Sequence, residues 1–173
     1  LKYWSDNYPD VVTGWNSRYF DIPYLINRLY RIGSDQAVKR LSPWNLVDAG
    51  MMENTYKIVG IEQADYLELF KKFGYSYGAQ ESYKLDHIGY TVLGEKKLSY
   101  EEHGSLHTLY KNDHQKFIDY NIKDVQLVQR IDDKMGLINL ALTVAYKGGV
   151  TLVETMGTTA IWDSIIYREL NKK

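Results

Sequence analysis

The sequence has no cysteine and only 3 prolines among its 173 residues. Without thiols the chain can form neither disulfide bonds nor thiolate metal sites, which is typical of a reducing compartment. The formal net charge is −1 at pH 7, with 45% hydrophobic and 25% charged residues. This balance excludes a generally basic surface, so any contact with nucleic acid must be local. We expect one globular domain.

Long hydrophobic runs are also missing. The most apolar window, residues 135–146, is bounded by Lys134 and Lys147 and is too short to cross a bilayer. No signal peptide is recognisable. The chain opens on Leu1 without a methionine. We therefore expect no membrane partner, and we expect the chain to start inside a larger protein or to be an engineered piece of one.

The strongest pattern that is present lies between about residues 112 and 147. Positions at steps of three or four carry Phe117, Tyr120, Asp124, Leu127, Ile131, Met135, Ile138 and Leu142. This spacing predicts one long helix that ends at Gly148-Gly149. Only Asp124 is charged, and a carboxylate on a core-facing stripe is costly unless it is paired or holds a metal. Tyr120 precedes it by one turn, so the two side chains are predicted to emerge together.

Shorter elements are predicted elsewhere. Residues 10–16 are typical of a strand that ends at a turn. Asp21-Ile22-Pro23 predicts a helix start with Asp21 as N-cap, and this helix runs to Gly33. The remaining predictions are a helix at 34–41, a loop or a hairpin centred near Asn54 at 44–60, a strand and helix at 61–72, a helix at 85–93, an irregular stretch at 101–109, a strand at 150–153 and a helix at 158–170. Helices dominate and no repeat occurs, so one compact unit is expected.

Two short motifs resemble the 3′–5′ exonuclease domain of family B DNA polymerases. Asn16-Ser17-Arg18-Tyr19-Phe20-Asp21 is similar to the second motif of that domain, N-x-x-x-F-D, and Tyr120-Asn121-Ile122-Lys123-Asp124 is similar to the third, Y-x-x-x-D. Residues 85–98 resemble the helix and turn between these motifs. Further segments resemble the T-even-like bacteriophage branch: 39–43, 65–73 and 159–166. The resemblance covers essentially the whole chain in collinear order.

The resemblance implies an α/β fold of the ribonuclease-H-like type. The fold would be helix-rich and incomplete, because the N-terminal strands of the sheet are missing. Residues 1–173 would form one partial 3′–5′ exonuclease domain that carries the second and third motifs. The implied function is proofreading within a phage-type DNA-directed DNA polymerase in the cytoplasm of the host cell. The substrate would be the 3′-terminal phosphodiester of single-stranded DNA.

The resemblance also implies roles for five residues. Mg²⁺ or Mn²⁺ would act as a pair of cations roughly 3.5–4 Å apart, held by carboxylates. Asp124 would be a ligand to the cation that carries the attacking water. Tyr120 would orient that water as a protonated hydrogen-bond partner. Asp21 would complete the metal cluster opposite Asp124, and Asn16 and Phe20 would line the site and hold the 3′-terminal nucleotide.

One family motif is absent. The first motif, D-x-E, supplies two further carboxylates from a leading strand, and the sequence contains no Asp-x-Glu. Two carboxylates cannot neutralise two divalent cations, so we predict weak metal affinity and negligible nuclease activity for this chain alone. The expected partners are an N-terminal segment with D-x-E and the palm, fingers and thumb of the polymerase. A second departure concerns residues 44–59. This segment is expected to be shorter than the corresponding hairpin region of the T-even-like bacteriophage branch that the chain resembles.

Simpler interpretations of the same residues remain open. Asp21 can act as a helix N-cap alone. Asp124 can pair with a lysine or arginine from another element, and Tyr120 can be a packed aromatic residue. The alternative function is a non-catalytic ribonuclease-H-like scaffold, or a DNA-binding module of a split polymerase.

Two more distant interpretations involve other side chains. A free-standing nuclease would need Glu53 or Glu62 as substitute metal ligands. His103 and His107 have helical spacing with His114 nearby, but solvated histidines are favoured over a zinc site there.

Overall fold

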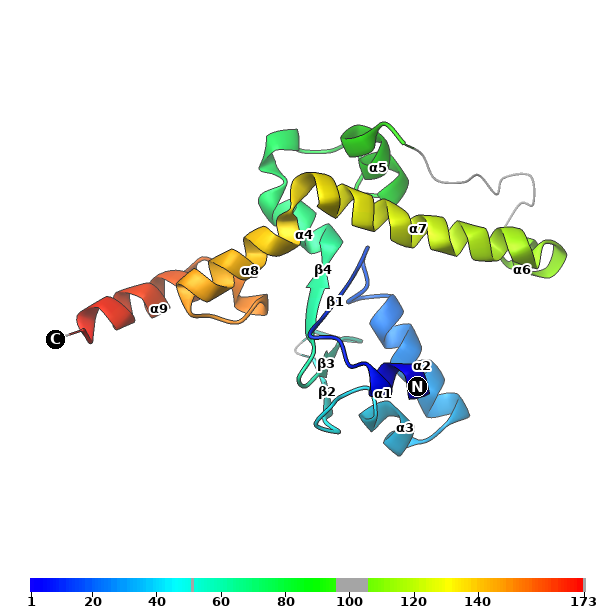
Figure 1. Cartoon of the computed structure of the whole chain (residues 1–173), viewed down its shortest axis with the longest axis horizontal. Helices are drawn as coiled ribbons and strands as arrows, with labels where there is room; N and C mark the ends of the chain where they lie inside the picture. Colours follow the sequence, from blue (N-terminus) through cyan, green and yellow to red (C-terminus); the bar gives the residue numbers. More distant parts are fainter. Residues whose placement is uncertain (51, 96–105, 173) are drawn as a thin grey trace. The chain divides into compact units, whose positions relative to one another are not determined.

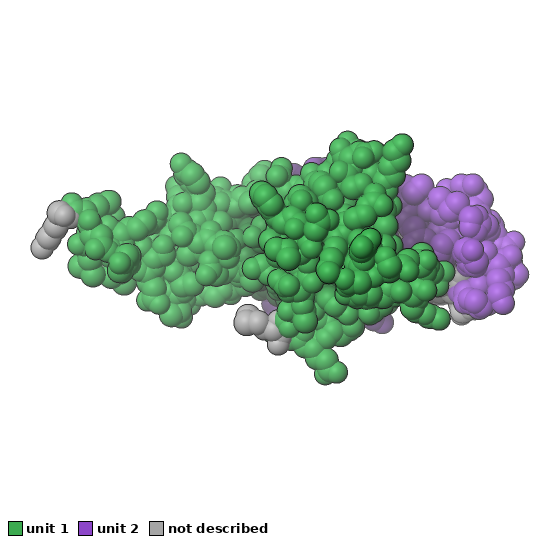
Figure 2. All heavy atoms as spheres, turned by 90° about the horizontal axis from the view of Figure 1, so that it is seen from below, with its two compact units in different colours: residues 1–73, 137–173 green, residues 74–136 purple. Residues whose placement is uncertain are grey.

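The structure is a computed structural model that describes residues 1–50, 52–95 and 106–172. The chain forms two compact units, unit 1 with residues 1–73 and 137–173 and unit 2 with residues 74–136 (Figure 2). The sequence predicts one compact unit, whereas the structure has two. The assignment of residues 1–173 to a single exonuclease domain stays a prediction. Within the described ranges, no helix combines the length and apolar character needed to cross a membrane.

Unit 1 combines helices with two small sheets (Figure 1). Its elements are α1 (Lys2–Asp6), β1 (Val11–Gly14), α2 (Asp21–Ile32), α3 (Asp35–Lys39), β2 (Val47–Ala49), β3 (Tyr56–Ile58), β4 (Glu62–Asp65), α4 (Tyr66–Phe73), α8 (Leu137–Gly148), the 3₁₀ helix η3 (Val153–Met156) and α9 (Thr159–Leu170). Strands β1 and β4 are parallel, with Gly14 opposite Asp65. Strands β2 and β3 form a hairpin, which is one of the two alternatives expected for residues 44–60, and Asn54 between them has a positive φ of 53°.

One hydrophobic cluster of unit 1 is built on a face of α2. Its buried members are Ile22, Ile26, Leu29, Val38, Leu41, Ile58 and Ile61. Three of these residues share the helical spacing of α2, which explains why this segment folds as an amphipathic helix. Asp21 is the first helical residue and Phe20 is the N-cap, without a side-chain capping bond. The predicted N-cap role of Asp21 is therefore wrong by one position.

Unit 2 contains η1 (Tyr75–Tyr77), α5 (Leu85–Leu93), α6 (Leu106–Asn112) and α7 (His114–Met135). Helix α5 lies against α7 (Figure 1). As predicted, α5 stops at Gly94, which adopts the left-handed conformation that glycine favours at a helix end. The Asp113 side chain caps α7 by accepting a hydrogen bond from the Lys116 backbone N–H at 2.9 Å.

The prediction of one helix over about 112–147 is wrong, because two helices cover this stretch. Helix α7 ends at Gly136, which has a φ of 63°, and α8 begins at Leu137. The apolar period continues through the break, so the spacing alone does not reveal it. The last stripe member, Leu142, is 40% exposed and does not belong to the core.

Two other predictions also differ from the structure. The strand predicted at 150–153 is absent, and η3 begins there instead. The prediction of an irregular stretch at 101–109 is wrong for residues 106–109, because α6 begins at Leu106. Residues 101–105 lie outside the described residues.

A capping box explains the turn at η3. The Glu154 carboxylate accepts hydrogen bonds from the Thr151 backbone N–H at 2.7 Å and from its hydroxyl at 2.9 Å. In return the Glu154 N–H donates to Thr151 Oγ1 at 3.4 Å. This reciprocal pair is a signal for a helical turn rather than a strand. The bond from the Thr151 backbone, followed by that from its hydroxyl, lowers the pKa of Glu154.

We expect the contribution of this capping box to depend on pH. A carboxylate whose pKa is lower in the folded state stabilises the fold above its unfolded pKa of about 4.3. It loses that effect as pH falls through the folded pKa. Glu154→Gln should lower the melting temperature at neutral pH, with the difference from wild type vanishing in acid. Thermal unfolding at several pH values measures this, with exposed Glu53→Gln as control. A difference that is the same at every pH would contradict the role of the charge.

Candidate functional site

The loop that connects β1 to α2 carries the second motif. It turns at Asn16, whose φ of 63° lies in the left-handed region that asparagine tolerates better than most residues. The Asn16 carbonyl then accepts a hydrogen bond from the Phe20 N–H at 3.1 Å, and the Ser17 carbonyl accepts one from the Ile22 N–H at 2.9 Å. These bonds bring the chain from an extended strand into the first turn of α2.

Side chains of the loop are anchored on α4. Arg18 Nη1 lies 2.9 Å from Glu68 Oε2, with both side chains partly shielded from water. The Trp15 ring packs on Tyr66 and Phe70, with centroid separations of 6.2 and 6.1 Å. Both of these partners are buried in unit 1. The loop is therefore attached to α4 by an ion pair on one side and an aromatic cluster on the other.

The loop backbone is held by Asp65 at the end of β4. Asp65 Oδ1 accepts from the Asn16 N–H at 3.1 Å, and Oδ2 accepts from the Arg18 N–H at 3.0 Å. Only 2% of Asp65 is exposed. Burial raises the pKa of its carboxyl group, and the hydrogen bond from the Arg18 backbone opposes that rise.

Phe20 and Asp21 emerge from the far end of this loop. The Phe20 side chain is 66% exposed although it is large and apolar. Asp21 is also an exposed residue at the first position of α2, where the helix dipole favours a negative charge. Neighbouring protein atoms still shield its carboxyl group enough that this burial raises its pKa. Unit 1 therefore presents an aromatic ring and a carboxylate side by side in sequence.

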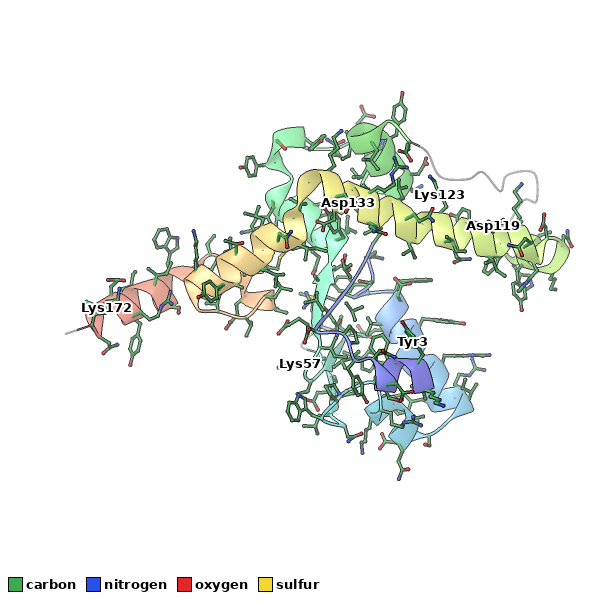
Figure 3. The ribbon with its side chains drawn as sticks, viewed as in Figure 1. Tyr3, Lys57, Asp119, Lys123, Asp133 and Lys172 are labelled. Carbon is green, nitrogen blue, oxygen red and sulfur yellow. The ribbon has the colours of Figure 1, made fainter. Side chains whose placement is uncertain are left out.

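The third motif lies on α7 in unit 2. Tyr120 is 9% exposed, and Asp124 follows one turn later as a half-buried residue whose Oδ1 atom is shielded from water. This agrees with the prediction that both side chains leave the same helix face. The same helix also carries Lys123 and Asp133 (Figure 3).

Helix α7 is contacted by α5 and by Glu95, two residues beyond the end of α5. A Cβ atom on Gly89 would lie 2.8 Å from Leu127 Cδ2, so only glycine lets the helices approach this closely without a shift. Glu95 Oε2 pairs with Lys123 Nζ at 3.4 Å, and Glu95 also pairs with Arg130. Lys123, the residue next to Asp124, is therefore paired with the segment that follows α5.

Comparison with known proteins shows the family of the chain. The family described as "DNA polymerase family B, exonuclease domain" matches residues 1–88, which is half of the chain. This chain belongs to the family B DNA polymerase exonuclease domains. The predicted resemblance to that family is confirmed.

Relatives of this exonuclease-domain chain include phage and eukaryotic polymerases. The DNA-directed DNA polymerase of Escherichia phage RB69 is 37% identical over 179 residues, which cover 100% of the chain and 19% of that polymerase. The DNA-directed DNA polymerase of Enterobacteria phage T4 is 34% identical over 176 residues, with coverages of 98% and 19%. The DNA polymerase delta catalytic subunit of Candida albicans is 30% identical over 145 residues, with coverages of 76% and 14%. The chain thus spans about a fifth or less of these proteins.

The predicted site residues of this exonuclease-domain chain fall into two groups. Asn16, Phe20 and Asp21 lie at the loop–helix junction of unit 1, and Tyr120 and Asp124 lie on α7 of unit 2. Within each group the structure brings the members together. The predicted meeting of Asp21 with Asp124, and the roles of all five residues, stay predictions.

The sequence offers two candidate metal sites, one for divalent cations on carboxylates and one for zinc on histidines. Over residues 1–50, 52–95 and 106–172, no three or more acidic or histidine side chains gather into a group that could hold a metal ion. His103 lies outside the described residues, and His107 is exposed. The His114 ring packs against Tyr110 and Phe117. Because His103 is not among the described residues, the preference for solvated histidines over a zinc site stays a prediction.

Sequence reasoning missed Asp65 as a contributor to the site. The residue immediately precedes α4 and accepts from the Leu67 N–H at 3.0 Å, which is the ordinary behaviour of an aspartate at a helix start. An acidic residue between a short strand and a helix is a detectable signal for such a cap. Its bonds to the second motif depend on the pairing of β4 with β1, which no local pattern reveals.

Proposed function

We propose that this chain contributes the second and third motifs of a proofreading 3′–5′ exonuclease. The supporting observation is that the family-matched segment ends its second motif in an exposed Phe20 and Asp21 at the start of α2. A single-stranded 3′ end can stack a base on an exposed aromatic ring while its terminal phosphate lies near the carboxylate that binds the cation. The proposed substrate is therefore single-stranded DNA, degraded from its 3′ end.

The proposed fold is ribonuclease-H-like α/β. The parallel pairing of β1 with β4 supports it, because parallel strands require a crossover connection and this one contains α2. The proposed partners are the other parts of a phage-type polymerase, including a segment with D-x-E and the palm, fingers and thumb. The proposed location is the cytoplasm of the phage host.

Mg²⁺ or Mn²⁺ is the proposed cofactor, and its chemistry fits the two acidic site residues. Carboxylate oxygens are the ligands that these hard cations prefer. Asp21 offers a carboxylate on an exposed helix start, and Asp124 offers one that is partly shielded from water. When bound, the two cations would activate the attacking water and neutralise charge on the leaving oxygen.

The remaining proposed roles are those of orientation. The hydroxyl of Tyr120, one turn before Asp124, would hold the attacking water in line with the phosphodiester, because a phenol stays protonated at neutral pH. Asn16 would line the site beside Phe20. No Asp-x-Glu occurs in the sequence, so we propose that these residues hydrolyse DNA only together with a D-x-E segment.

Mixing this chain with a D-x-E segment from a phage relative tests the proposal. We expect the mixture to shorten a 5′-labelled single-stranded oligonucleotide with a free 3′ end when Mn²⁺ is present. Neither part alone should shorten it. The label position matters, because removal of single nucleotides from the 3′ end gives a ladder of labelled products. Loss of the ladder with chelator confirms that a cation is needed.

The other outcomes decide between the proposed function and its alternative. Activity of the chain without the added segment would contradict our account of the metal ligands. A stable but inactive complex would favour a non-catalytic scaffold or DNA-binding module. Binding of the same oligonucleotide by that complex, measured by fluorescence anisotropy, would distinguish the DNA-binding module from the scaffold.

A further inference from the structure

The Asp65 carboxylate makes more bonds than a helix cap requires. A capping aspartate needs one oxygen to accept an N–H from the first turn, and Asp65 Oδ1 does this for Leu67 at 3.0 Å. The same oxygen also accepts from Asn16 at 3.1 Å, and the second oxygen accepts from Arg18 at 3.0 Å. Two of the three bonds therefore hold the second-motif loop rather than α4.

The strand register explains why this carboxylate can reach the loop. Gly14, the last residue of β1, lies opposite Asp65, the last residue of β4. Both strands end at this level of the sheet. The chain continues from β1 into the loop and from β4 into α4. The left-handed conformation of Asn16 then turns the chain so that the N–H groups of residues 16 and 18 both face Asp65. Backbone N–H groups that converge in such a turn form a favourable site for an anionic group.

Burial makes the loss of these hydrogen bonds costly. Asp65 is 2% exposed, and Ser17, between the two bound amides, is 5% exposed. Water therefore has little access to replace a lost acceptor, and an unsatisfied buried N–H is costly. The next residues along the chain are Tyr19, Phe20 and Asp21, which are exposed. Their positions depend on where the buried part of the loop is held.

We propose that Asp65 is a positioning residue of the exonuclease site, which fixes the loop that presents Phe20 and Asp21. This inference rests on the proposed function for its catalytic meaning. Asp65 acts through the backbone of the loop, because its carboxylate accepts hydrogen bonds from the N–H groups of residues 16 and 18. It couples the end of β4 and the start of α4 to the motif in the loop that follows the neighbouring strand β1.

Asp65→Ser separates positioning from capping. Serine is a good N-cap and can accept from the Leu67 N–H, but its single short hydroxyl cannot also reach the amides of Asn16 and Arg18. If Asp65 served only as a cap, this variant would behave as wild type. We instead expect the Asn16 and Arg18 amides to exchange with solvent roughly tenfold faster or more, while the Leu67 amide keeps its protection.

Asp65→Asn is the conservative variant. Its carboxamide has one oxygen and one NH₂ group, so whichever way it is turned, a donor faces at least one of the three amides. The better orientation keeps the bonds to Asn16 and Leu67 and loses the bond to Arg18. We therefore expect faster exchange at Arg18 alone and partial rescue of activity. Ser34→Ala, which removes the N-cap of α3, is the control for loss of a cap elsewhere in unit 1.

Amide exchange on the full chain and hydrolysis by its mixture with a D-x-E segment are the two measurements. We expect Asp65→Ser to lower kcat roughly 10²-fold, the scale of a misplaced catalytic group, with Ser34→Ala unchanged. Wild-type exchange at residues 16 and 18 in Asp65→Ser, or full activity of that variant, would overturn the inference. An inactive wild-type mixture would instead overturn the proposed function, and the exchange data would still decide whether Asp65 holds the loop.

Discussion

Asp124→Ala should strongly slow the hydrolysis of single-stranded DNA by the mixture of this chain with a D-x-E segment. The proposed role of Asp124 is to hold the cation that carries the attacking water, and such a cation contributes several kcal/mol to stabilising the transition state. A loss of about 4 kcal/mol corresponds to a rate reduction of roughly 10³-fold. Single-turnover degradation of a 5′-labelled oligonucleotide with Mn²⁺ measures the rate of the chemical step directly.

A matched control is available on the same helix. Asp133 lies on α7, is exposed and is not part of the third motif (Figure 3), so Asp133→Ala should keep wild-type activity. Because Asp124 is half-buried, its replacement can also change stability. Amide exchange across α7 separates the two effects. Wild-type activity of Asp124→Ala, or equal losses in both variants, would contradict the metal-ligand role.

Much of the fold could be predicted because its signals are local. The start of α2 at Asp21, the end of α5 at Gly94 and the hairpin turn near Asn54 all follow from residues within one turn of the feature. The break at Gly136 could not be predicted from spacing, because the apolar period continues across it. A single glycine inside a helical pattern is compatible with both a continuous helix and an end.

The site shows the same distinction between local and distant contacts. Phe20 and Asp21 are adjacent, and Tyr120 and Asp124 are one helical turn apart, so short motifs identify both pairs. Asp65 lies 49 residues from Asn16 along the chain, yet the two are hydrogen-bonded. That bond exists because β1 and β4 pair in one register, and register is a property of the assembled sheet. The residues that present a motif are therefore harder to predict than the motif itself.

The contact between Gly89 and Leu127 links the stability of unit 2 to the position of the third motif. Leu127 is fully buried and lies one turn after Asp124 on the face of α7 that meets α5. Its methyl groups fill the space that a side chain at position 89 would otherwise occupy. Because Gly89 has no side chain, it cannot fill the cavity that a smaller residue at position 127 would leave. This contact should therefore respond strongly to truncation.

We expect Leu127→Ala to destabilise unit 2 by about 3–5 kcal/mol, in the upper part of the range for buried leucine truncations, because the cavity stays unfilled. Native-state amide exchange in α5 and α7 measures this loss for the unit itself. Val125→Ala, on the same helix at a side chain that is 70% exposed, should change the free energy by no more than about 0.5 kcal/mol. Similar losses in the two variants would show that burial against Gly89 is not the cause.

A second substitution tests the contact itself. In the wild-type chain, the new methyl group of Gly89→Ala would lie 2.8 Å from Leu127 Cδ2, so the leucine must move. In Leu127→Ala the same methyl group enters the vacated space. Gly89→Ala should therefore be more favourable in the Leu127→Ala background than in wild type, with a coupling energy of about 0.5–3 kcal/mol. The gain in helix propensity from glycine to alanine is common to both backgrounds and cancels in the cycle. A coupling energy of zero would mean that these two positions do not set the distance between α5 and the helix that carries Tyr120 and Asp124.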